Sequence, residues 1–313
     1  MKIVGRFAPS PTGPLHIGSL FTALGSYLLA KSKGGEWFLR IDDLDKQRVI
    51  PEMMDDIFRT LEFFGFEWDR EPIWQSKRDK SYQQALEVLK DKGLIYMCGC
   101  SRAEIARIAT APHGSSEELF YPGTCRNGIE KGKILRAARV RVPNDLIKFN
   151  DKVVGRYQQN LGEICGDFVV KRADGPFAYH LATVVDDFDS GVNQVVRGGD
   201  LLYSTPRQIY LQRVLGYPQP EYYHLPLILS EGGSKLSKRD NAISLMNSDD
   251  LLKRGNFLLK SALKLLGQRI PASSEADSPR EILQYGITNF DFNVLPKVDS
   301  LKLSHYSKSG GSL

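Results

Sequence analysis

The spacing of hydrophobic and polar positions at the start of the chain predicts a strand, a helix and a second strand. Residues 1–7 are mostly apolar, and a loop rich in proline and glycine follows them at 8–14. From Ile17 to Leu28 the apolar residues recur every three or four positions, which is typical of one face of a helix. A glycine pair ends that helix, and the run 37–41 predicts the second strand. This order predicts a parallel, right-handed βαβ unit.

Further along, the same patterning predicts two more helices before it loosens. Pro51 suits the first position of one helix, and Ser76 suits the N-cap of another that ends near Gly93. From residue 98 to about 162 the pattern is irregular, which indicates an inserted segment. Strand-like runs then return, followed by a helix with a leucine face: 167–171, 192–196 and 225–229, then Leu252, Leu259, Leu263 and Leu266.

Composition narrows the class of protein. The 313 residues are 42% hydrophobic and 25% charged, which is typical of a soluble globular protein. No apolar run approaches the ~20 residues of a membrane helix, and the N-terminus lacks the long apolar stretch of a secretory signal. We therefore expect a cytoplasmic monomer without a membrane partner. The net charge of +5 permits a polyanionic partner without requiring one.

The first stretch with candidate chemistry is 11–19, between the first strand and its helix. A helix N-terminus presents unpaired N–H groups and a positive dipole end, which suit a phosphate. Gly18 leaves room for a flat ring or a ribose to approach the backbone, and His16 has an N–H to donate to phosphate oxygens. A proline-rich turn with a structural histidine would look the same.

The second stretch is the run Lys235-Leu236-Ser237-Lys238, which follows a pair of glycines. Glycines give a loop mobility, and two lysines supply positive charge that can follow a transferring phosphate group. On its own, such a run is also typical of a solvated surface turn.

Together, the two loops resemble the paired signatures of class I aminoacyl-tRNA synthetases. Three further stretches are similar to motifs of the glutamyl/glutaminyl branch of that family: Gly5–Gly13, Arg40–Asp45 and Val196–Leu202. The resemblance covers roughly the first 240 residues in order. It implies an α/β fold with a Rossmann-type parallel sheet that binds ATP at its carboxyl edge. An inserted zinc-binding α+β segment and a small C-terminal helical region complete the implied architecture.

The resemblance also implies roles for residues of the two loops. His16 and Lys238 are the implied catalytic residues, because they would stabilise charge on the transferring phosphate group. Mg²⁺ would be held mainly through the ATP phosphates. The implied ATP-binding residues are His16, Gly18, Ser19, Lys235 and Lys238.

A dicarboxylate ligand fits the residues of the other motifs. Arg6 and Arg197 offer guanidinium forks for the side-chain carboxylate, although each would also fit an ion pair. Asp42 offers a negative partner for the α-ammonium group, and Tyr179 a phenolic donor. Many relatives have Glu where this chain has Asp42, so the geometry there departs from the family pattern. By resemblance, glutamate is bound by Arg6, Phe7, Ala8, Pro9, Ser10, Asp42, Tyr179 and Arg197.

Three of the four cysteines, Cys98, Cys100 and Cys125, lie within 28 residues of one another. In a reducing compartment this grouping favours a metal over a disulfide. Zinc takes four ligands, and His113 is the nearby histidine. The pattern resembles the zinc-binding arm of the glutamyl-queuosine tRNA(Asp) synthetase family, which implies Tyr121 as the fourth ligand.

Other polar and sulfur-bearing residues suggest structural roles. Cys165 stands apart and is expected to be a small buried hydrophobe. His180 and His224 flank apolar residues and are more typical of structural histidines than of catalysts. For residues 186–189, with three aspartates, a polar loop at a strand end is favoured over a metal site.

The predicted division of the chain has four parts: a first catalytic half at 1–97, an inserted zinc-binding segment at 98–165, a second catalytic half at 166–240, and a helical region with a flexible tail at 241–313. A full glutamyl-tRNA synthetase continues through a large anticodon-binding region, whereas about 75 residues follow Lys238 here. This difference strengthens the resemblance to the glutamyl-queuosine family.

That resemblance implies activation of glutamate by ATP and transfer of glutamate to queuosine at the wobble position of tRNA(Asp). The catalytic body would then bind the anticodon loop. Three alternatives stay open. They are a short glutamyl-tRNA synthetase that charges the 3′ end of tRNA(Glu), a non-catalytic synthetase-like RNA-binding protein, and a nucleotidyltransferase outside the synthetases.

Overall fold

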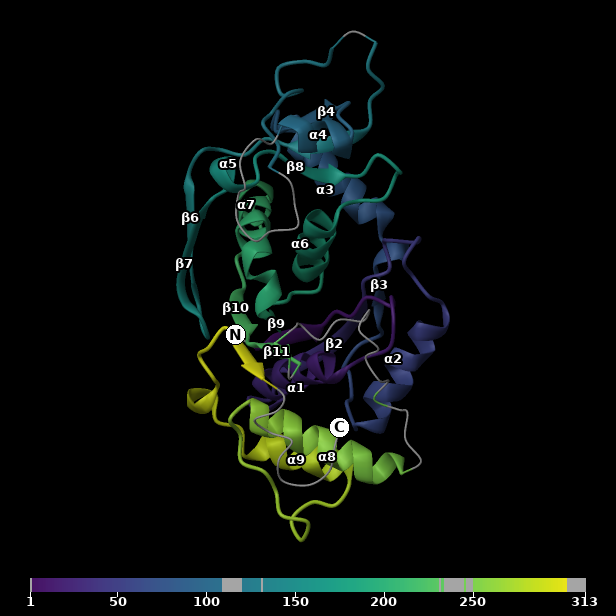
Figure 1. The fold of residues 1–313 in the computed structure, drawn as a ribbon, viewed down its shortest axis with the longest axis vertical. Coiled ribbons are helices and arrows are strands. Elements are labelled where there is room, and N and C mark those ends of the chain that lie inside the picture. Colours follow the sequence, from purple (N-terminus) through teal and green to yellow (C-terminus); the bar gives the residue numbers. More distant parts are fainter. Residues whose placement is uncertain are drawn as a thin grey trace.

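A parallel sheet lies between two layers of helices in the computed structural model, which describes residues 2–108, 120–130, 132–230, 232–233, 245 and 250–302 (Figure 1). All pairings within this sheet are parallel. β1 and β9 lie side by side, because the backbone N–H of Asn193 donates to the carbonyl of Val4 at 3.2 Å. The resulting order is β3-β2-β1-β9-β10, with bounds Val4–Phe7 (β1), Glu36–Ile41 (β2), Ile73–Trp74 (β3), Gln194–Gly198 (β9) and Glu221–Leu225 (β10).

Both faces of the sheet are covered, because alternate side chains of each strand enter different cores. Trp37, Leu39 and Val196 belong to one core, whereas Phe38 and Val195 belong to the other. The helices on the first face are α1 (Ile17–Lys31), α8 (Leu251–Leu265) and α9 (Pro279–Thr288). Those on the second face are α3 (Asp79–Asp91), α6 (Tyr179–Asp189) and α7 (Thr205–Leu215).

The predicted βαβ unit is confirmed by β1, α1 and β2. Three smaller expectations were wrong. Ser76 is not an N-cap, because both its N–H and its hydroxyl are bound to the Asp43 carboxylate, and α3 begins three residues later. The run 225–229 is not one strand, because Pro226 has no N–H and separates β10 from β11 (Leu227–Leu229). Leu252 is 53% exposed, although the other three leucines of that face are buried.

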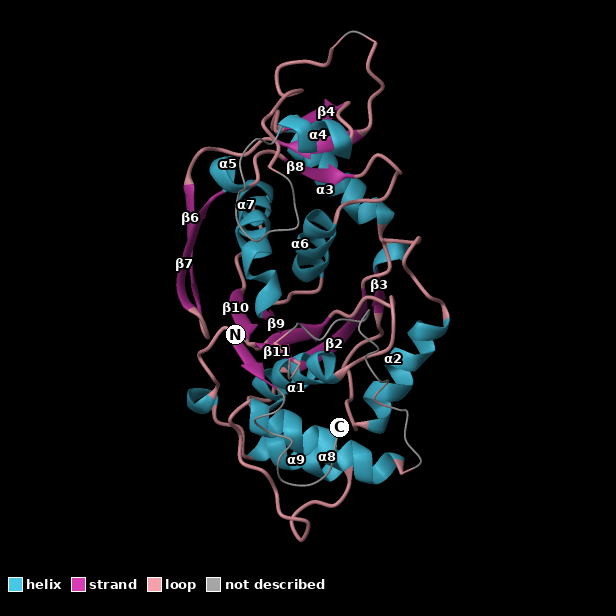
Figure 2. Cartoon of the chain, viewed as in Figure 1, coloured by secondary structure: helices cyan, strands magenta, loops and turns pink. Residues whose placement is uncertain are grey.

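The middle of the chain forms a second, antiparallel sheet at the far end of the molecule (Figure 2). Its order is β4-β5-β8, and a separate hairpin of β6 and β7 runs from it along the side of the molecule. The irregular pattern at 98–162 therefore conceals short strands. The bounds are Ile95–Cys98 (β4), Ala137–Val140 (β5), Leu146–Asp151 (β6), Gly155–Asn160 (β7) and Phe168–Lys171 (β8).

The sheet β4-β5-β8 joins segments on both sides of the predicted boundaries at 98 and 165, which themselves stay predictions. The remaining elements are α2 (Glu52–Phe63), α4 (Arg102–Ile108), α5 (Leu161–Ile164), β12 (Ser300–Lys302) and short 3₁₀ helices at Gln75–Lys77, Gly199–Ser204 and Phe292–Val294. Within the described part of the chain, no helix has the length and apolar character needed to cross a membrane.

Candidate active site and cysteine cluster

Four polar side chains lie near the carboxyl ends of four adjacent parallel strands. Arg6 is on β1, Arg40 on β2, Arg197 on β9 and His224 on β10, and the last two are register partners. Each comes two residues after an apolar side chain that packs in the core beneath α3, α6 and α7. Strand alternation therefore directs all four toward the same face. The carboxyl edge is where open parallel sheets bind their ligands.

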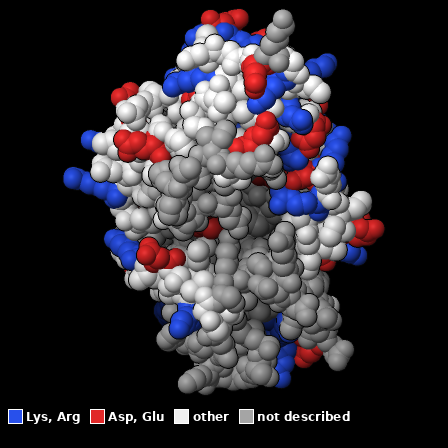
Figure 3. Space-filling view, turned by 45° about the horizontal axis from the view of Figure 1, so that its top comes forward, with Lys and Arg blue, Asp and Glu red and all other residues white. Residues whose placement is uncertain are grey.

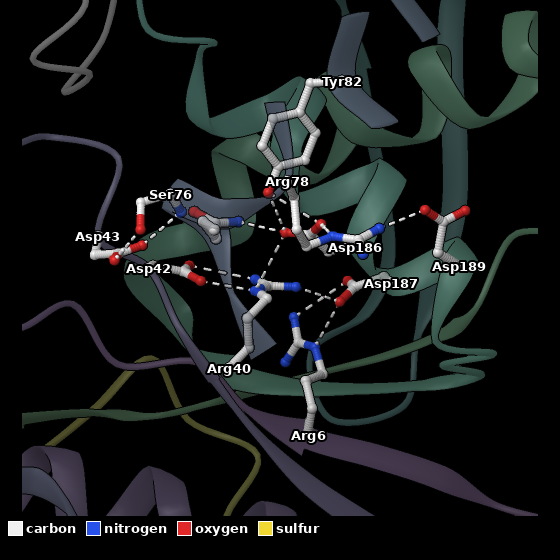
Figure 4. Close-up of polar contacts among 11 residues, drawn as sticks. Arg6, Arg40, Asp42, Asp43, Ser76, Arg78, Tyr82, Asp186, Asp187 and Asp189 are labelled. Carbon is white, nitrogen blue, oxygen red and sulfur yellow. Dashed lines mark hydrogen bonds and ion pairs between the residues drawn. The ribbon is translucent and has the colours of Figure 1, made fainter. Parts of the chain in front are cut away.

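A buried ion network connects two of these arginines to helix α6 (Figure 4). Asp187 accepts from Nε of Arg6 at 3.1 Å and from Nη1 of Arg40 at 2.6 Å. Arg40 also donates from Nε to Asp42 at 2.7 Å. The remaining nitrogens of Arg6 contact Asp187 and the carbonyl of Val196. Asp187 thus lies between two guanidiniums, and Arg40 between two carboxylates.

The pKa shifts in this network follow from burial and pairing. Burial opposes the charged form of Asp187, but Arg6 and Arg40 outweigh it and hold the pKa below its usual range. For Arg40, burial again works against charge, while Asp42 and Asp187 raise the pKa well above its usual range. Asp187 and Arg40 are therefore both held in their charged forms, whereas burial raises the pKa of Asp42 although Arg40 opposes it.

The network continues through Asp186, the neighbour of Asp187 on α6. Its carboxylate accepts from Gln75 at 2.7 Å, from Arg78 at 2.5 Å and from the Tyr82 hydroxyl at 2.9 Å. The buried ion network, as we name it, consists of Arg6, Arg40, Asp42, Arg78, Asp186 and Asp187.

The expectation of a polar loop at 186–189 was wrong, because Asp186, Asp187 and Asp189 lie on α6. Sequence reasoning also gave no role to Arg40 or to Asp187. A signal was present, since two adjacent aspartates occupy a helix whose other positions are largely apolar. Buried acids of that kind call for buried cations.

Arg197 differs from Arg6 in how its nitrogens are used. Its Nε lies 3.1 Å from Nε2 of His224, and its Nη2 lies 2.8 Å from the hydroxyl of Thr205. Its Nη1 is buried and has no hydrogen-bond partner among the described residues. The structure therefore leaves one donor group of this arginine available beside the ion network.

Of the other predicted glutamate-binding residues, Phe7 to Ser10 and Asp42 lie at the same edge of the sheet. Phe7 ends β1, and Ala8 to Ser10 form the loop that follows it. This loop is tied to the next strand, because the N–H of Asp42 donates to the carbonyl of Pro9 at 3.0 Å. Tyr179 is the first residue of α6, so one helix carries both Tyr179 and Asp187. In the structure Asp42 is bound by Arg40, a motif residue to which sequence reasoning gave no role of its own.

The start of α1 is capped by a histidine ring. Nδ1 of His16 accepts from the N–H groups of Gly18 at 3.1 Å and of Ser19 at 3.3 Å. The neutral ring therefore carries its proton on Nε2. A Cβ on Gly18 would lie 3.0 Å from the ring, so glycine here makes room for the cap. Two N–H groups expected to meet a phosphate are thus engaged by His16. Lys235 and Lys238 lie outside the described residues.

The second candidate site is a cysteine cluster, made of Cys98, Cys100, Cys125 and Tyr121. The three sulfur atoms lie within 4.8 Å of one another, and those of Cys100 and Cys125 are 3.6 Å apart. The sulfur of Cys98 is 3.4 Å from the Tyr121 hydroxyl oxygen, which also accepts from the N–H of Cys125 at 2.9 Å. All four side chains are buried.

This spacing fits a tetrahedral metal ion, because metal–sulfur bonds of ~2.3 Å place sulfur atoms just under ~4 Å apart. Burial, together with Cys125, raises the pKa of Cys100 to about 11. Burial also acts on Cys98, but Tyr121 and Arg139 outweigh it and lower its pKa. The alternative ligand His113 lies outside the described residues. Cys165 is buried in a different apolar core, as predicted, although its backbone carbonyl accepts from the N–H of Tyr121 at 3.0 Å.

The surface of the molecule is mixed in charge. On the face drawn in Figure 3, acidic and basic side chains are interspersed across the described part. This agrees with the near balance of 42 basic and 37 acidic residues in the sequence. Charge alone therefore does not locate a nucleic-acid surface on that face.

Comparison with known proteins gives a consistent result. Residues 2–305 match the family described as tRNA synthetases class I (E and Q), catalytic domain. A protein named glutamyl-Q tRNA(Asp) synthetase from Geobacter sulfurreducens is 54% identical over 294 residues, covering 94% of each chain. One of the same name from Dechloromonas aromatica is 49% identical, covering 94% of this chain and 95% of that protein.

A solved structure is similar over almost the whole chain. It is a glutamate tRNA ligase from Elizabethkingia meningosepticum in complex with its amino acid. The TM-score is 0.78 at 29% identity, and the match covers 97% of this chain and 67% of that one.

Proposed function

Because this chain belongs to the family of glutamyl-Q tRNA(Asp) synthetases, we propose that it activates glutamate with ATP and transfers the glutamyl group to queuosine in tRNA(Asp). It is a ligase. The observation that carries this function is the identity of 54% across 94% of both chains with a relative of that name. The geometry at the carboxyl edge of the sheet supports it, because Arg6 and Arg197 lie on adjacent strands there and Nη1 of Arg197 has no partner among the described residues.

In the first step, the α-carboxylate of glutamate attacks the α-phosphate of ATP. This forms glutamyl-adenylate and releases pyrophosphate. His16 and Lys238 stabilise the charge that develops on the phosphate, and Lys235 assists. The His16 ring suits this role because its Nε2 carries a proton that it can donate. Mg²⁺ accompanies ATP through the phosphate oxygens, and Gly18 and Ser19 complete the ATP site.

Glutamate is held by the edge of the sheet and by α6. Nη1 of Arg197 donates to the side-chain carboxylate, which supplies the partner that this buried nitrogen otherwise lacks. Arg6, fixed by Asp187, adds positive charge beside it. Tyr179 donates a phenolic hydrogen bond, and Asp42 attracts the α-ammonium group. The loop from Phe7 to Ser10 closes the pocket.

In the second step, a hydroxyl on the cyclopentene ring of queuosine attacks the carbonyl carbon of the adenylate, and AMP leaves. The nucleophile belongs to the RNA, so positioning is the main task of the protein. The catalytic body therefore binds the anticodon loop of tRNA(Asp).

The cysteine cluster holds a structural zinc ion in this proposal. Cys98, Cys100 and Cys125 supply thiolates, and Tyr121 supplies the fourth ligand. The hydrogen bond from the N–H of Cys125 to the Tyr121 oxygen supports this, because it would stabilise a phenolate. Bound zinc would cross-link β4 to the loop that contains Tyr121 and Cys125.

The test incubates the protein with ATP, labelled glutamate and one of three RNAs. These are queuosine-containing tRNA(Asp), the same tRNA with guanosine at the wobble position, and queuosine-containing tRNA(Asp) trimmed of its 3′-terminal nucleotides. We expect label on the first and third RNAs only. Label on the guanosine form, or loss of label after trimming, would show charging of the 3′ end instead. A His16→Ala variant should lose activity on every RNA.

A further inference from the structure

A chain of buried polar side chains runs from the β6–β7 hairpin to Arg197. Asp151, the last residue of β6, places Oδ2 2.6 Å from Nδ1 of His224. On the other side of the ring, Nε2 lies 3.1 Å from Nε of Arg197. Thr205, at the start of α7, places its hydroxyl 2.8 Å from Nη2 of the same arginine. The Asp151 and His224 side chains have no exposed surface.

The contacts fix the tautomer of His224. Nε of Arg197 can only donate, so Nε2 of His224 accepts and the ring proton lies on Nδ1. That proton is donated to Asp151. Burial, the larger cause, lowers the pKa of His224 although Asp151 opposes it, so the ring stays neutral. This tautomer sets the direction of the hydrogen bonds from Arg197 through His224 to Asp151. The Thr205 hydroxyl lies 3.0 Å from the same Nε2 and 3.2 Å from the carbonyl of Leu201.

Asp151 has little freedom to change its own role. Its Oδ1 already accepts from the N–H groups of Val153 and Val154 at 2.9 Å each, and from the N–H of His224 at 3.2 Å. Only Oδ2 faces the histidine ring. The hairpin is also tied to β10, because the N–H of Lys152 donates to the carbonyl of Tyr222 at 2.9 Å.

We propose that Asp151, His224 and Thr205 are positioning residues for Arg197. Together they hold Nε and Nη2, so that the plane of the guanidinium is fixed and Nη1 points to the side-chain carboxylate of glutamate. This inference rests on the proposed function, in which Arg197 binds glutamate. It also makes the hairpin of the inserted segment part of the amino-acid site, since Asp151 comes from that hairpin.

The first test is Asp151→Asn, which keeps the size of the side chain. Because Oδ1 is occupied, the amide NH₂ takes the place of Oδ2 and faces Nδ1 of His224. The ring proton then moves to Nε2, where it meets the N–H of Arg197. We expect KM for glutamate to rise about tenfold or more, since a hydrogen bond to a charged group is lost, while KM for ATP stays unchanged.

The second test compares Thr205→Val with Thr205→Ser. Valine removes the hydroxyl that binds Nη2 of Arg197, whereas serine retains it. We expect Thr205→Val to raise KM for glutamate, whereas Thr205→Ser should keep KM for glutamate close to that of the wild type. This pair decides the question if Asp151→Asn does not fold.

Asp167→Asn is the matched control for a buried carboxylate. Asp167 also accepts a backbone N–H, from Val142 at 2.8 Å, but it lies in the β4-β5-β8 region. The Asp167→Asn variant should have the same KM for glutamate as the wild type. All assays measure glutamate incorporation into queuosine-containing tRNA(Asp), with glutamate and ATP varied in turn.

The outcomes distinguish failure of the proposed function from failure of the positioning role of Asp151, His224 and Thr205. If the wild-type protein forms no glutamylated tRNA(Asp), the proposed function fails. If the wild type is active and the folded Thr205→Val variant keeps its KM for glutamate, the positioning role is overturned and the function stands. An equal rise in both KM values would also overturn the positioning role, because it would indicate general damage to the fold.

Discussion

The buried ion network and the cysteine cluster differ in how their buried charges are balanced. In the network, carboxylates and guanidiniums alternate, so that Asp187 contacts Arg6 and Arg40 at once. In the cysteine cluster, three thiols and a phenol face one another, and each of these groups can ionise only to an anion. The cation beside them is Arg139, whose guanidinium lies 3.7 Å from the centre of the Tyr121 ring.

This difference shows which region is complete without a ligand. The ion network is neutralised by protein side chains from β1, α6, β2 with the residue after it, and the residue before α3, so it can hold the edge of the sheet before any substrate arrives. The cysteine cluster, once its thiols are deprotonated, requires positive charge that one arginine does not balance. We therefore expect loss of a network residue to act through folding, and loss of a cluster residue to act through metal.

The largest expected effect comes from Asp187→Asn. The change leaves Arg6 and Arg40 buried beside a neutral amide, and breaking a buried ion pair in this way costs about 3–5 kcal/mol. Urea denaturation should show this loss in the free energy of unfolding.

The control for that measurement is Arg269→Gln, which removes an exposed ion pair with Glu275. Solvent screens such pairs, so the free energy of unfolding should hardly change. Equal losses in the two variants would contradict the view that the network is an integral part of the fold.

The contrast also explains what could be predicted from the sequence. The first βαβ unit was predictable because helix and strand periods are local properties that show within about 18 residues or fewer. The grouping of Cys98, Cys100 and Cys125 was predictable because these residues are close in sequence, whereas Tyr121 was proposed from the family resemblance. Arg6 and Arg197 could be proposed as ligand-binding residues because they belong to family motifs.

The ion network was not predictable in the same way. Its central contact joins Arg40 to Asp187, which are 147 residues apart, and sequence periodicity does not reveal which charges pair. The same holds for Ser76, whose local sequence favours an N-cap but whose hydroxyl is bound by Asp43, 33 residues away. Tertiary contacts outweighed local preference at both places.

The next largest effect is expected from Cys125→Ser, which tests whether the cysteine cluster binds zinc. Cys125→Ser removes one thiolate, so the purified protein should contain much less zinc by elemental analysis and should melt at a lower temperature. Cys165→Ser is the matched control, because Cys165 is equally buried but lies outside the cluster. It should retain the zinc of the wild type. Equal zinc contents in the two variants would contradict a metal site here.

A smaller effect is expected from Arg139→Gln. Arg139 is buried, stacks on the Tyr121 ring and donates from Nη1 to the carbonyl of Asp167 at 2.7 Å. If the cluster binds zinc as proposed, the positive charge of Arg139 would offset the negative charge of the thiolates and the phenolate. Outer residues of this kind change metal affinity about tenfold or more. Competition with a chelator should show weaker zinc retention in the variant. Unchanged retention would mean that the cluster is neutralised by the ion alone.

The smallest effect is a difference between the wild type and His224→Gln in how the free energy of unfolding depends on pH. Burial lowers the pKa of His224 in the folded protein, so the unfolded chain binds a proton first, below about pH 6.5. The stability of the wild type should therefore fall with decreasing pH from there to the lower folded pKa, by at most about 1.4 kcal/mol per pH unit from this group. The variant lacks that contribution, and the cysteine cluster, identical in both proteins, cancels in the comparison. Urea titrations at several pH values would measure the two slopes, and equal slopes would show that the pKa of His224 is the same in the folded and the unfolded chain.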